Sequence, residues 1–389
     1  MFSDRTNWRL AHNRFTRAVE EVRASGGRLL DLSASNPTRV GLDVNQQAIL
    51  QSLASPQVLD YDPQAKGLRS AREEVASYYR AAHGIHSLDP ERIILTSSTS
   101  EGYSYIFRLL CNAGDELLVP KPSYPLFEFL ADLQDVKLIP YPLIYDHGWQ
   151  MDFDSLQKAV TGRTRGVVVV HPNNPTGSYV HASEFDPFNK FCAQHGLAMI
   201  VDEVFLDYPL DNSPHASFAG NPDVLTFTLS GLSKISALPQ MKVAWLVTTG
   251  PENQVNAAMG RLEVIADTYL SMNAPVQWAI PVLLEQRHDV QRQLRARVKS
   301  NLAEVDRQLA SAKACQRLSL EGGWYAVLRV PVTRSDEELA IELVREKSVL
   351  VHPGHFYDFP GDGYLVLSLI TAPDDFVAGV GRLLEFMGR

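Results

Sequence analysis

The sequence predicts an α/β protein with a large, mostly parallel sheet flanked by helices and a smaller α+β region at the C-terminal end. From about Asp89 onward, short β-branched runs alternate with amphipathic stretches, as in strands joined by crossover helices. After Pro275 the apolar residues instead take a helical spacing. A chain of 389 residues that is 45% hydrophobic and 21% charged can bury a core of this size.

The first forty or so residues are predicted to form an arm. A helix near residues 11–24 leads into the extended segment 30–37, whose proline and small residues suit a strand that passes a ligand. We therefore divide the chain into an N-terminal arm at 1–45, a large domain at 46–280, and a small domain at 281–389 that packs with the arm.

Six β-branched runs in the central block are predicted to be strands of the large sheet. They are residues 93–96, 117–120, 166–170, 198–201, 224–229 and 243–248. Active sites of parallel sheets gather at the carboxyl ends of the strands. Polar residues that directly follow these runs are therefore candidate site residues.

The C-terminal region begins with one long predicted helix that links the two domains. Its apolar residues step by three or four and are Val290, Leu294, Val298, Leu302, Val305 and Leu309. Beyond it we expect a strand at 324–330, a helix opened by the capping pair Ser335 and Glu338, strands near 349–352 and 364–369, and a last helix.

Composition excludes several classes of function. The formal charge of −9 and the lack of any Lys and Arg cluster argue against nucleic acid and anionic membrane surfaces as partners. No apolar run approaches the roughly 20 residues that cross a bilayer, and the N-terminus lacks the apolar core of a secretory signal. We predict a cytoplasmic protein. Three widely spaced cysteines indicate no disulfide framework and no metal site.

The chemistry centres on Lys234, which follows an apolar run in the segment SGLSK. A lysine nucleophile needs a lowered pKa and a carbonyl partner. Lysines after strands are common and usually only solvated, so this segment alone is a weak signal. Its neighbours strengthen it: Asp202 ends the run 198–201 and opens DEVF, and Asn174 lies in PNNPTG.

This set of PNNPTG, DEVF and SGLSK resembles the class I and II aminotransferases of fold type I, over nearly the whole chain. The resemblance implies the cofactor pyridoxal 5'-phosphate, held by Lys234 as a Schiff base. Lys234 would also move the reacting proton, and Asp202 would keep the pyridine nitrogen protonated. The implied reaction is ping-pong transfer of an amino group between an amino acid and a 2-oxo acid.

Further cofactor contacts follow from the same resemblance. Asn174 matches the residue that binds the 3'-oxygen, and Tyr124 the aromatic residue that stacks on the ring. The phosphate cup comprises the backbone amides of Ser98 and Thr99, with Ser230, Ser233 and Lys242. Each has a plain structural alternative, since Asn174 suits a turn, Asp202 a helix N-cap, and Ser98 with Glu101 a capping box.

Tyr61 matches a tyrosine that reaches the phosphate of a neighbouring subunit. The resemblance therefore implies a homodimer with shared active sites. No nucleic acid or membrane partner is expected, and the substrates are small molecules.

Two departures from the family pattern concern the site. Phe205 stands where a tyrosine often bonds the 3'-oxygen, which leaves Asn174 as the main partner or raises the pKa of the Schiff base. Val366 stands where the family has an arginine for the substrate carboxylate. A carboxylate in an apolar cleft without a cation costs several kcal/mol. The resemblance implies that the arm passes over the substrate at about Ser35 and that Asn174 also lies beside the substrate. Arg39, four residues beyond Ser35, is one candidate replacement for the arginine, and an exposed cation after a proline turn is the alternative.

The missing arginine also keeps another reaction open. A pyridoxal-phosphate-dependent decarboxylase, lyase or oxidase would use the same cofactor on an amino acid or an amine. A ligand-sensing regulator on this fold is a third reading, but the arm is too short for a helix-turn-helix domain and carries no basic surface.

Overall fold

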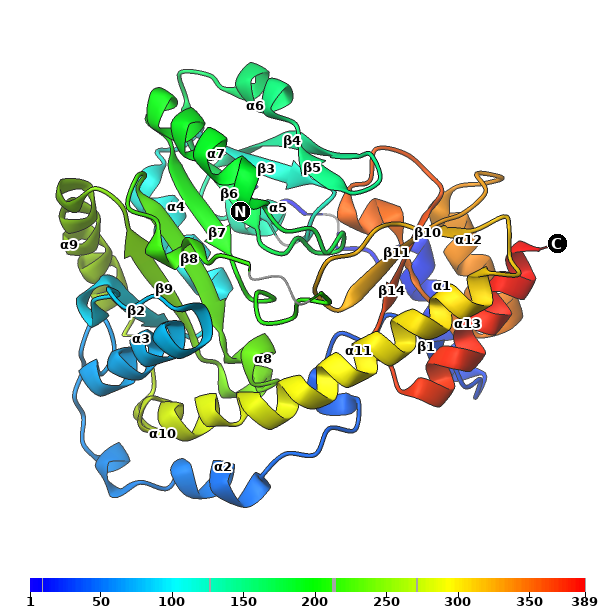
Figure 1. Ribbon diagram of the computed structural model, residues 1–389, viewed down its shortest axis with the longest axis horizontal. Coiled ribbons are helices and arrows are strands. Elements are labelled where there is room, and N and C mark those ends of the chain that lie inside the picture. The colour runs from blue at the N-terminus through cyan, green and yellow to red at the C-terminus, as the bar shows by residue number, and fades with distance from the viewer. Residues whose placement is uncertain (9, 126, 212–214, 271, 389) are drawn as a thin grey trace.

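The computed structural model describes residues 1–388 except 9, 126, 212–214 and 271. Within these residues, the largest sheet has eight strands in the order β2-β9-β8-β7-β6-β3-β4-β5. Neighbours from β8 through β4 are parallel, whereas β9 is antiparallel to both β2 and β8. The predicted α/β fold with a mostly parallel sheet is confirmed (Figure 1).

Each of the six predicted strands of this sheet is present. They are β2 (Ile93–Thr96), β3 (Glu116–Lys121), β6 (Thr164–Val170), β7 (Ala198–Asp202), β8 (Thr226–Gly231) and β9 (Ala244–Thr249). The sequence analysis missed β4 (Lys137–Tyr145) and β5 (Trp149–Met151). Strand β4 is half exposed and carries Pro140 and Pro142, and prolines in a run argue against a strand.

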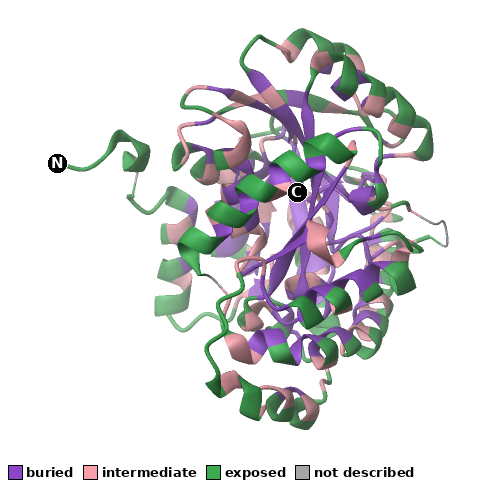
Figure 2. Cartoon of the chain, turned by 90° about the vertical axis from the view of Figure 1, so that its left-hand side faces the viewer, coloured by how far each residue is buried: buried purple, intermediate pink, exposed green. Residues whose placement is uncertain are grey.

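Helices cover both faces of the large sheet, and the strands between them are buried (Figure 2). One face packs against α4 (Thr99–Leu110), α5 (Phe127–Asp132) and α9 (Glu252–Tyr269). The other packs against α3 (Arg69–His83), α6 (Phe153–Ala159), α7 (Ala182–His195), α8 (Leu232–Ile235) and α10 (Ala274–Glu285). The short helix α2 (Gln46–Ser52) lies against α10 (Figure 1).

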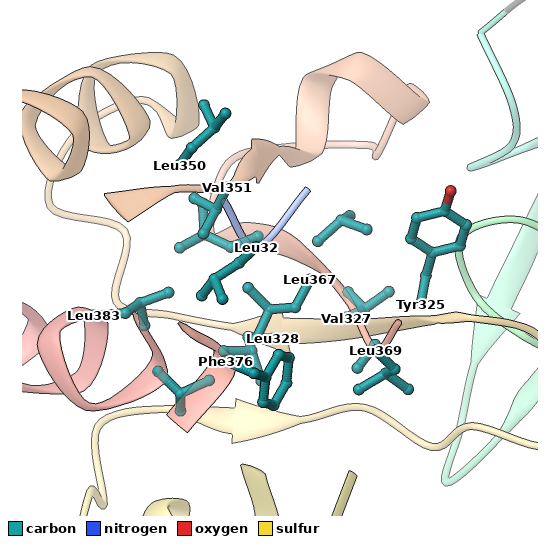
Figure 3. Close-up of a cluster of buried hydrophobic side chains, with 14 of the residues drawn as sticks. Leu32, Tyr325, Val327, Leu328, Leu350, Val351, Leu367, Leu369, Phe376 and Leu383 are labelled. Atoms are coloured by element: carbon teal, nitrogen blue, oxygen red, sulfur yellow. The ribbon is translucent and has the colours of Figure 1, made fainter. Parts of the chain in front are cut away.

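A second, antiparallel sheet has the order β10-β11-β14-β13. Its strands are β10 (Gln316–Arg317), β11 (Tyr325–Arg329), β14 (Tyr364–Ser368) and β13 (His352–Pro353). Helices α12 (Asp336–Glu342) and α13 (Pro373–Met387) pack beside it, and Ser335 caps α12 by accepting from the Glu338 amide at 3.2 Å. Figure 3 shows the apolar cluster that β11, β14 and α13 share with Leu32 of the arm.

The arm joins this second unit directly. Strand β1 (Leu30–Asp31) pairs in parallel with β12 (Val349–Leu350), and α1 (Arg14–Ala24) packs on α12. The predicted long helix is α11 (Arg287–Leu309), which runs from α10 to the second sheet (Figure 1). Our domain limits at residues 45 and 280 remain a prediction. In the described part of the chain, no helix is both long and apolar enough to span a membrane.

Candidate active site

A cavity of about 460 Å³ opens where the parallel strands of the large sheet meet the arm and the second sheet. Nine of the thirteen predicted site residues, all within the described chain, line it. They are Ser35, Ser98, Thr99, Tyr124, Asn174, Asp202, Phe205, Ser233 and Lys234. They come from segments up to about two hundred residues apart, because the carboxyl ends of parallel strands share one edge of the sheet.

Lys234 lies in the short helix α8, directly after β8. Its Nζ sits 5.4 Å from the ring centre of Phe205 and 4.9 Å from that of Trp324. Burial lowers the pKa of Lys234 to about 8, although the nearby charge of Asp202 raises it. Roughly a tenth of the amine is therefore unprotonated at pH 7, far more than for a lysine of ordinary pKa, and a nucleophile or base requires this neutral form.

Two residues that the sequence analysis missed hold the Lys234 turn in place. The hydroxyl of Tyr208 donates to the Lys234 carbonyl at 2.6 Å. The side-chain amide of Gln291, from α11, donates to the Ile235 carbonyl at 3.0 Å and to Asp207 Oδ2 at 2.7 Å. The lysine backbone is thus fixed by both the large sheet region and the linking helix.

Asp202 is the last residue of β7, and its two oxygens accept hydrogen bonds of 3.1 Å. The donors are the hydroxyl of Tyr103, from α4, and the amide of Val204. Burial raises the pKa of Asp202 to about 6, while both hydrogen bonds and the charge of Lys234 lower it. No helix starts at Asp202 in the described chain, so the N-cap alternative does not apply.

Asn173 and Asn174 are adjacent but serve different purposes. Asn173 donates to the Pro122 carbonyl and to Thr176 Oγ1, both at 2.9 Å, and so builds the turn. Asn174 is 8% exposed, and its Oδ1 is buried with no hydrogen-bond partner in the described chain. A buried amide without a partner costs stability. Its side chain is therefore available to a ligand in the cavity.

The start of α4 offers backbone donors to the cavity. Ser98 caps the helix by accepting from the Glu101 amide at 3.2 Å. Glu101 in turn accepts from the amide of Ser97 at 2.6 Å, not from that of Ser98, so the expected capping box is shifted by one residue. Within the described residues, the amides of Ser98 and Thr99 have no acceptor. A helix start with free amides suits an anion such as a phosphate.

The structure does not bring the other four predicted residues to this cavity. Ser230 is buried in β8, and its hydroxyl donates to the Glu203 carbonyl at 3.4 Å. Gly231 lines the cavity instead, and a Cβ there would lie 2.8 Å from Ala244, so this position has no room for a side chain. The side chains of Lys242, Tyr61 and Arg39 are exposed, Lys242 after the 3-10 turn Pro239–Met241 and Arg39 at the end of the turn Pro37–Arg39.

The wall opposite the large sheet contains predicted strands, but none of its residues was predicted to belong to the site. It consists of Tyr325, His352, Phe356 and Tyr357, from the second sheet and the turn after it. His352 Nδ1 lies 2.9 Å from the hydroxyl of Tyr357. Figure 3 shows Tyr325 at the edge of the apolar cluster with its hydroxyl directed away from it. No short motif marks these residues, and only the folding of the chain places them here.

Comparisons with known proteins agree on one family. The family model for aminotransferases of class I and II matches residues 28–372. The glutamate-pyruvate aminotransferase AlaA of Escherichia coli strain K12 is 25% identical over 376 residues, covering 95% of this chain and 93% of that protein. An alanine aminotransferase of Mycobacterium tuberculosis strain H37Rv is 28% identical over 378 residues, covering 94% and 87%.

Solved structures have the same fold. An aminotransferase from Escherichia coli superposes with a TM-score of 0.89 at 25% identity, covering 100% of this chain and 98% of that one. An alanine aminotransferase from Pyrococcus furiosus superposes with a TM-score of 0.90 at 22% identity and covers both chains completely.

Proposed function

The chain belongs to the class I and II aminotransferases, of fold type I, and we propose that its cavity binds pyridoxal 5'-phosphate at Lys234 for amino-group transfer. The observation that carries the proposal is the meeting of a half-buried lysine, a half-buried carboxylate and an asparagine whose buried Oδ1 has no partner, all in one cavity. Relatives named as aminotransferases also favour transfer over the decarboxylase, lyase or oxidase alternative.

The residues present fit this cofactor. The free amides of Ser98 and Thr99 supply a phosphate site, Tyr124 lines the cavity with an aromatic face, and Asn174 has a buried oxygen without a partner. The cavity also has room for a ring and a substrate together. When bound, pyridoxal phosphate supplies an electron sink for the substrate Cα, which amino-acid side chains lack.

The side chains around the proposed cofactor each have a defined task in the reaction. Lys234 supplies the amine for the covalent link and, once released, holds the proton taken from Cα on its Nζ. Asp202 offers a carboxylate that stabilises positive charge in the cavity, and Tyr103 orients that carboxylate. Phe205 and Trp324 pack around Lys234 Nζ and exclude water from it, which keeps its pKa low.

The names of the relatives suggest alanine or glutamate as amino donor and pyruvate as acceptor. To test the function, cofactor-loaded protein is mixed with one amino acid and no acceptor. The bound cofactor should convert to its amino form, with release of one 2-oxo acid per site. Release of carbon dioxide or ammonia without the amino form would support the decarboxylase, lyase or oxidase alternative instead.

We predict that cofactor capture depends on the protonation of Lys234. Only the neutral amine attacks an aldehyde, and its pKa is about 8. The rate of pyridoxal phosphate uptake by cofactor-free protein should therefore rise with pH from 7 and level off above 8 to 9. Stopped-flow absorbance across this range measures it, with Lys242→Ala as the control. A rate that is flat over this range would show that Lys234 is not the titrating group.

We further propose a homodimer in which Tyr61 serves the neighbouring site. The side chain of Tyr61 is 81% exposed, and it lines a separate surface hollow with Leu270 and Trp278, both also exposed. Exposed apolar side chains gathered in one patch are typical of an interface between chains.

Subunit mixing tests the shared sites. Lys234→Ala and Tyr61→Ala chains, each inactive alone, should regain roughly a quarter of wild-type activity after exchange, because half of the dimers are hybrids with one intact site. Size-exclusion chromatography with differently tagged chains verifies the exchange. Proven exchange without recovered activity would rule out the proposed role of Tyr61.

A further inference from the structure

The part of the cavity that would hold the substrate has no arginine to bind a carboxylate. An amino acid donor carries a carboxylate, and an anion in a partly buried site needs a cation or strong hydrogen-bond donors. Among the described residues that line the cavity, only Lys234 and His352 have side chains that can take a positive charge. Lys234 is committed to the cofactor under the proposed function. Burial lowers the pKa of His352, which leaves this residue as a neutral hydrogen-bond donor.

The position of His352 is fixed by its surroundings. It lies in β13, where its backbone pairs with Val366 of β14, and its ring centre is 5.7 Å from that of Phe356. The hydroxyl of Tyr357 lies 2.9 Å from His352 Nδ1. The hydrogen bond that one ring nitrogen of a histidine makes determines whether the other nitrogen is a donor or an acceptor. When the tyrosine donates to Nδ1, the ring carries its hydrogen on Nε2 and presents it as a donor.

No hydrogen bond uses His352 Nε2 in the described part of the chain. Tyr325 lines the same wall from β11. Ser35, from the arm, lines the cavity as well, whereas Arg39 does not. The wall therefore offers several neutral donors with one imidazole among them, in a cavity whose floor holds Asp202 and Lys234.

We propose that His352 binds the carboxylate of the amino donor through Nε2, and that Tyr357 is the positioning residue that orients its ring. This rests on the proposed function, since it assumes an amino acid as the donor. It names His352 as the residue that distinguishes amino acids from amines lacking the carboxylate.

The central variant is His352→Phe, which keeps a ring against Phe356 but removes both nitrogens. The KM of the best amino acid donor should rise about tenfold or more, because a hydrogen bond to a charged group is lost, while kcat changes little. The affinity for the amine with the same side chain, measured by calorimetry, should stay the same. His352→Gln, which keeps a donor, should recover part of the affinity.

One further measurement makes the result independent of turnover. The 2-methyl analogue of the donor has no Cα proton to lose, so its Kd reports binding alone, and it should weaken in His352→Phe as the KM does. His355→Phe and Arg39→Ala are matched controls, because neither residue lines the cavity and both are exposed. Both should match the wild type.

The outcomes separate the two proposals. If the cofactor bound to the wild-type protein is not converted to its amino form by any amino acid, the proposed function fails. If the wild type reacts but His352→Phe leaves both the KM and the analogue Kd unchanged, the carboxylate role of His352 is wrong. An equal loss of affinity for amino acid and amine would also overturn it, since the ring would then only shape the cavity.

Discussion

Lys234→Ala should lower turnover by at least about 10³-fold, because the variant loses the proton carrier as well as the covalent attachment. No other lysine lines the cavity among the described residues. The free amides at the start of α4 and the side chain of Asn174 are unchanged, so the variant should still bind pyridoxal phosphate, only non-covalently. Steady-state kinetics and dialysis of the bound cofactor measure the two effects.

Borohydride reduction followed by peptide mapping is a second test of the role of Lys234. The pyridoxyl group should be found on Lys234 of the wild type. Lys242→Ala is the matched control, since Lys242 is the nearest following lysine, and its exposed side chain does not line the cavity. A label on another lysine, or a Lys234→Ala protein of undiminished activity, would contradict the assignment.

The parts of the fold that the sequence predicted share a physical basis. Strands β6 and β7 are continuous apolar runs buried on both faces, so local composition and tertiary position agree. In strand β4, the local composition and the tertiary position disagree. Its Pro140 and Pro142 oppose a strand locally, and only pairing with β3 on one side and β5 on the other defines it.

The same distinction applies to the cavity. Lys234, Asp202 and Asn174 each sit in a short motif next to a strand end, and the resemblance of these motifs to a known family was enough to predict that they share one site. Tyr103 and Gln291 support the site from within helices, where no local pattern sets them apart from core residues.

Ser230 shows why a motif does not fix which residue lines a cavity. The segment SGLSK offers a serine at two positions: Ser230, at the end of β8, turns its hydroxyl to the Glu203 carbonyl, whereas Ser233, in α8, lines the cavity. Between them, the close approach of Ala244 leaves no room for a side chain at Gly231. That choice depends on contacts with β9, which lies in a later part of the chain.

Asp202→Asn should separate the contribution of this carboxylate to catalysis from its effect on stability. The amide keeps an oxygen to accept from Tyr103 but has no acceptor for the Val204 amide and carries no charge. Turnover should fall by about 10²- to 10³-fold as the stabilisation of positive charge in the cavity is lost. The stability of the cofactor-free variant, in contrast, should gain on that of the wild type as the pH rises from 4.5 to 8.

The sign of the stability effect follows from the pKa of Asp202. Burial raises that pKa from 3.8 to about 6, so the folded state binds the proton more tightly than the unfolded state does. The wild type therefore loses stability as the pH rises from about 4 to about 6, by on the order of 1–3 kcal/mol, and the loss persists above that range. The uncharged asparagine does not incur this penalty.

Denaturant unfolding of the cofactor-free proteins at pH 4.5 and pH 8 tests the prediction. The difference in unfolding free energy between variant and wild type should shift in favour of Asp202→Asn between pH 4.5 and pH 8, by on the order of 1–3 kcal/mol. Tyr103→Phe is the matched control, because it removes the donor to Asp202 but keeps the charge. A variant that is destabilised at pH 8 as much as it is inactivated would mean that Asp202 chiefly supports folding, and the catalytic assignment would have to be abandoned.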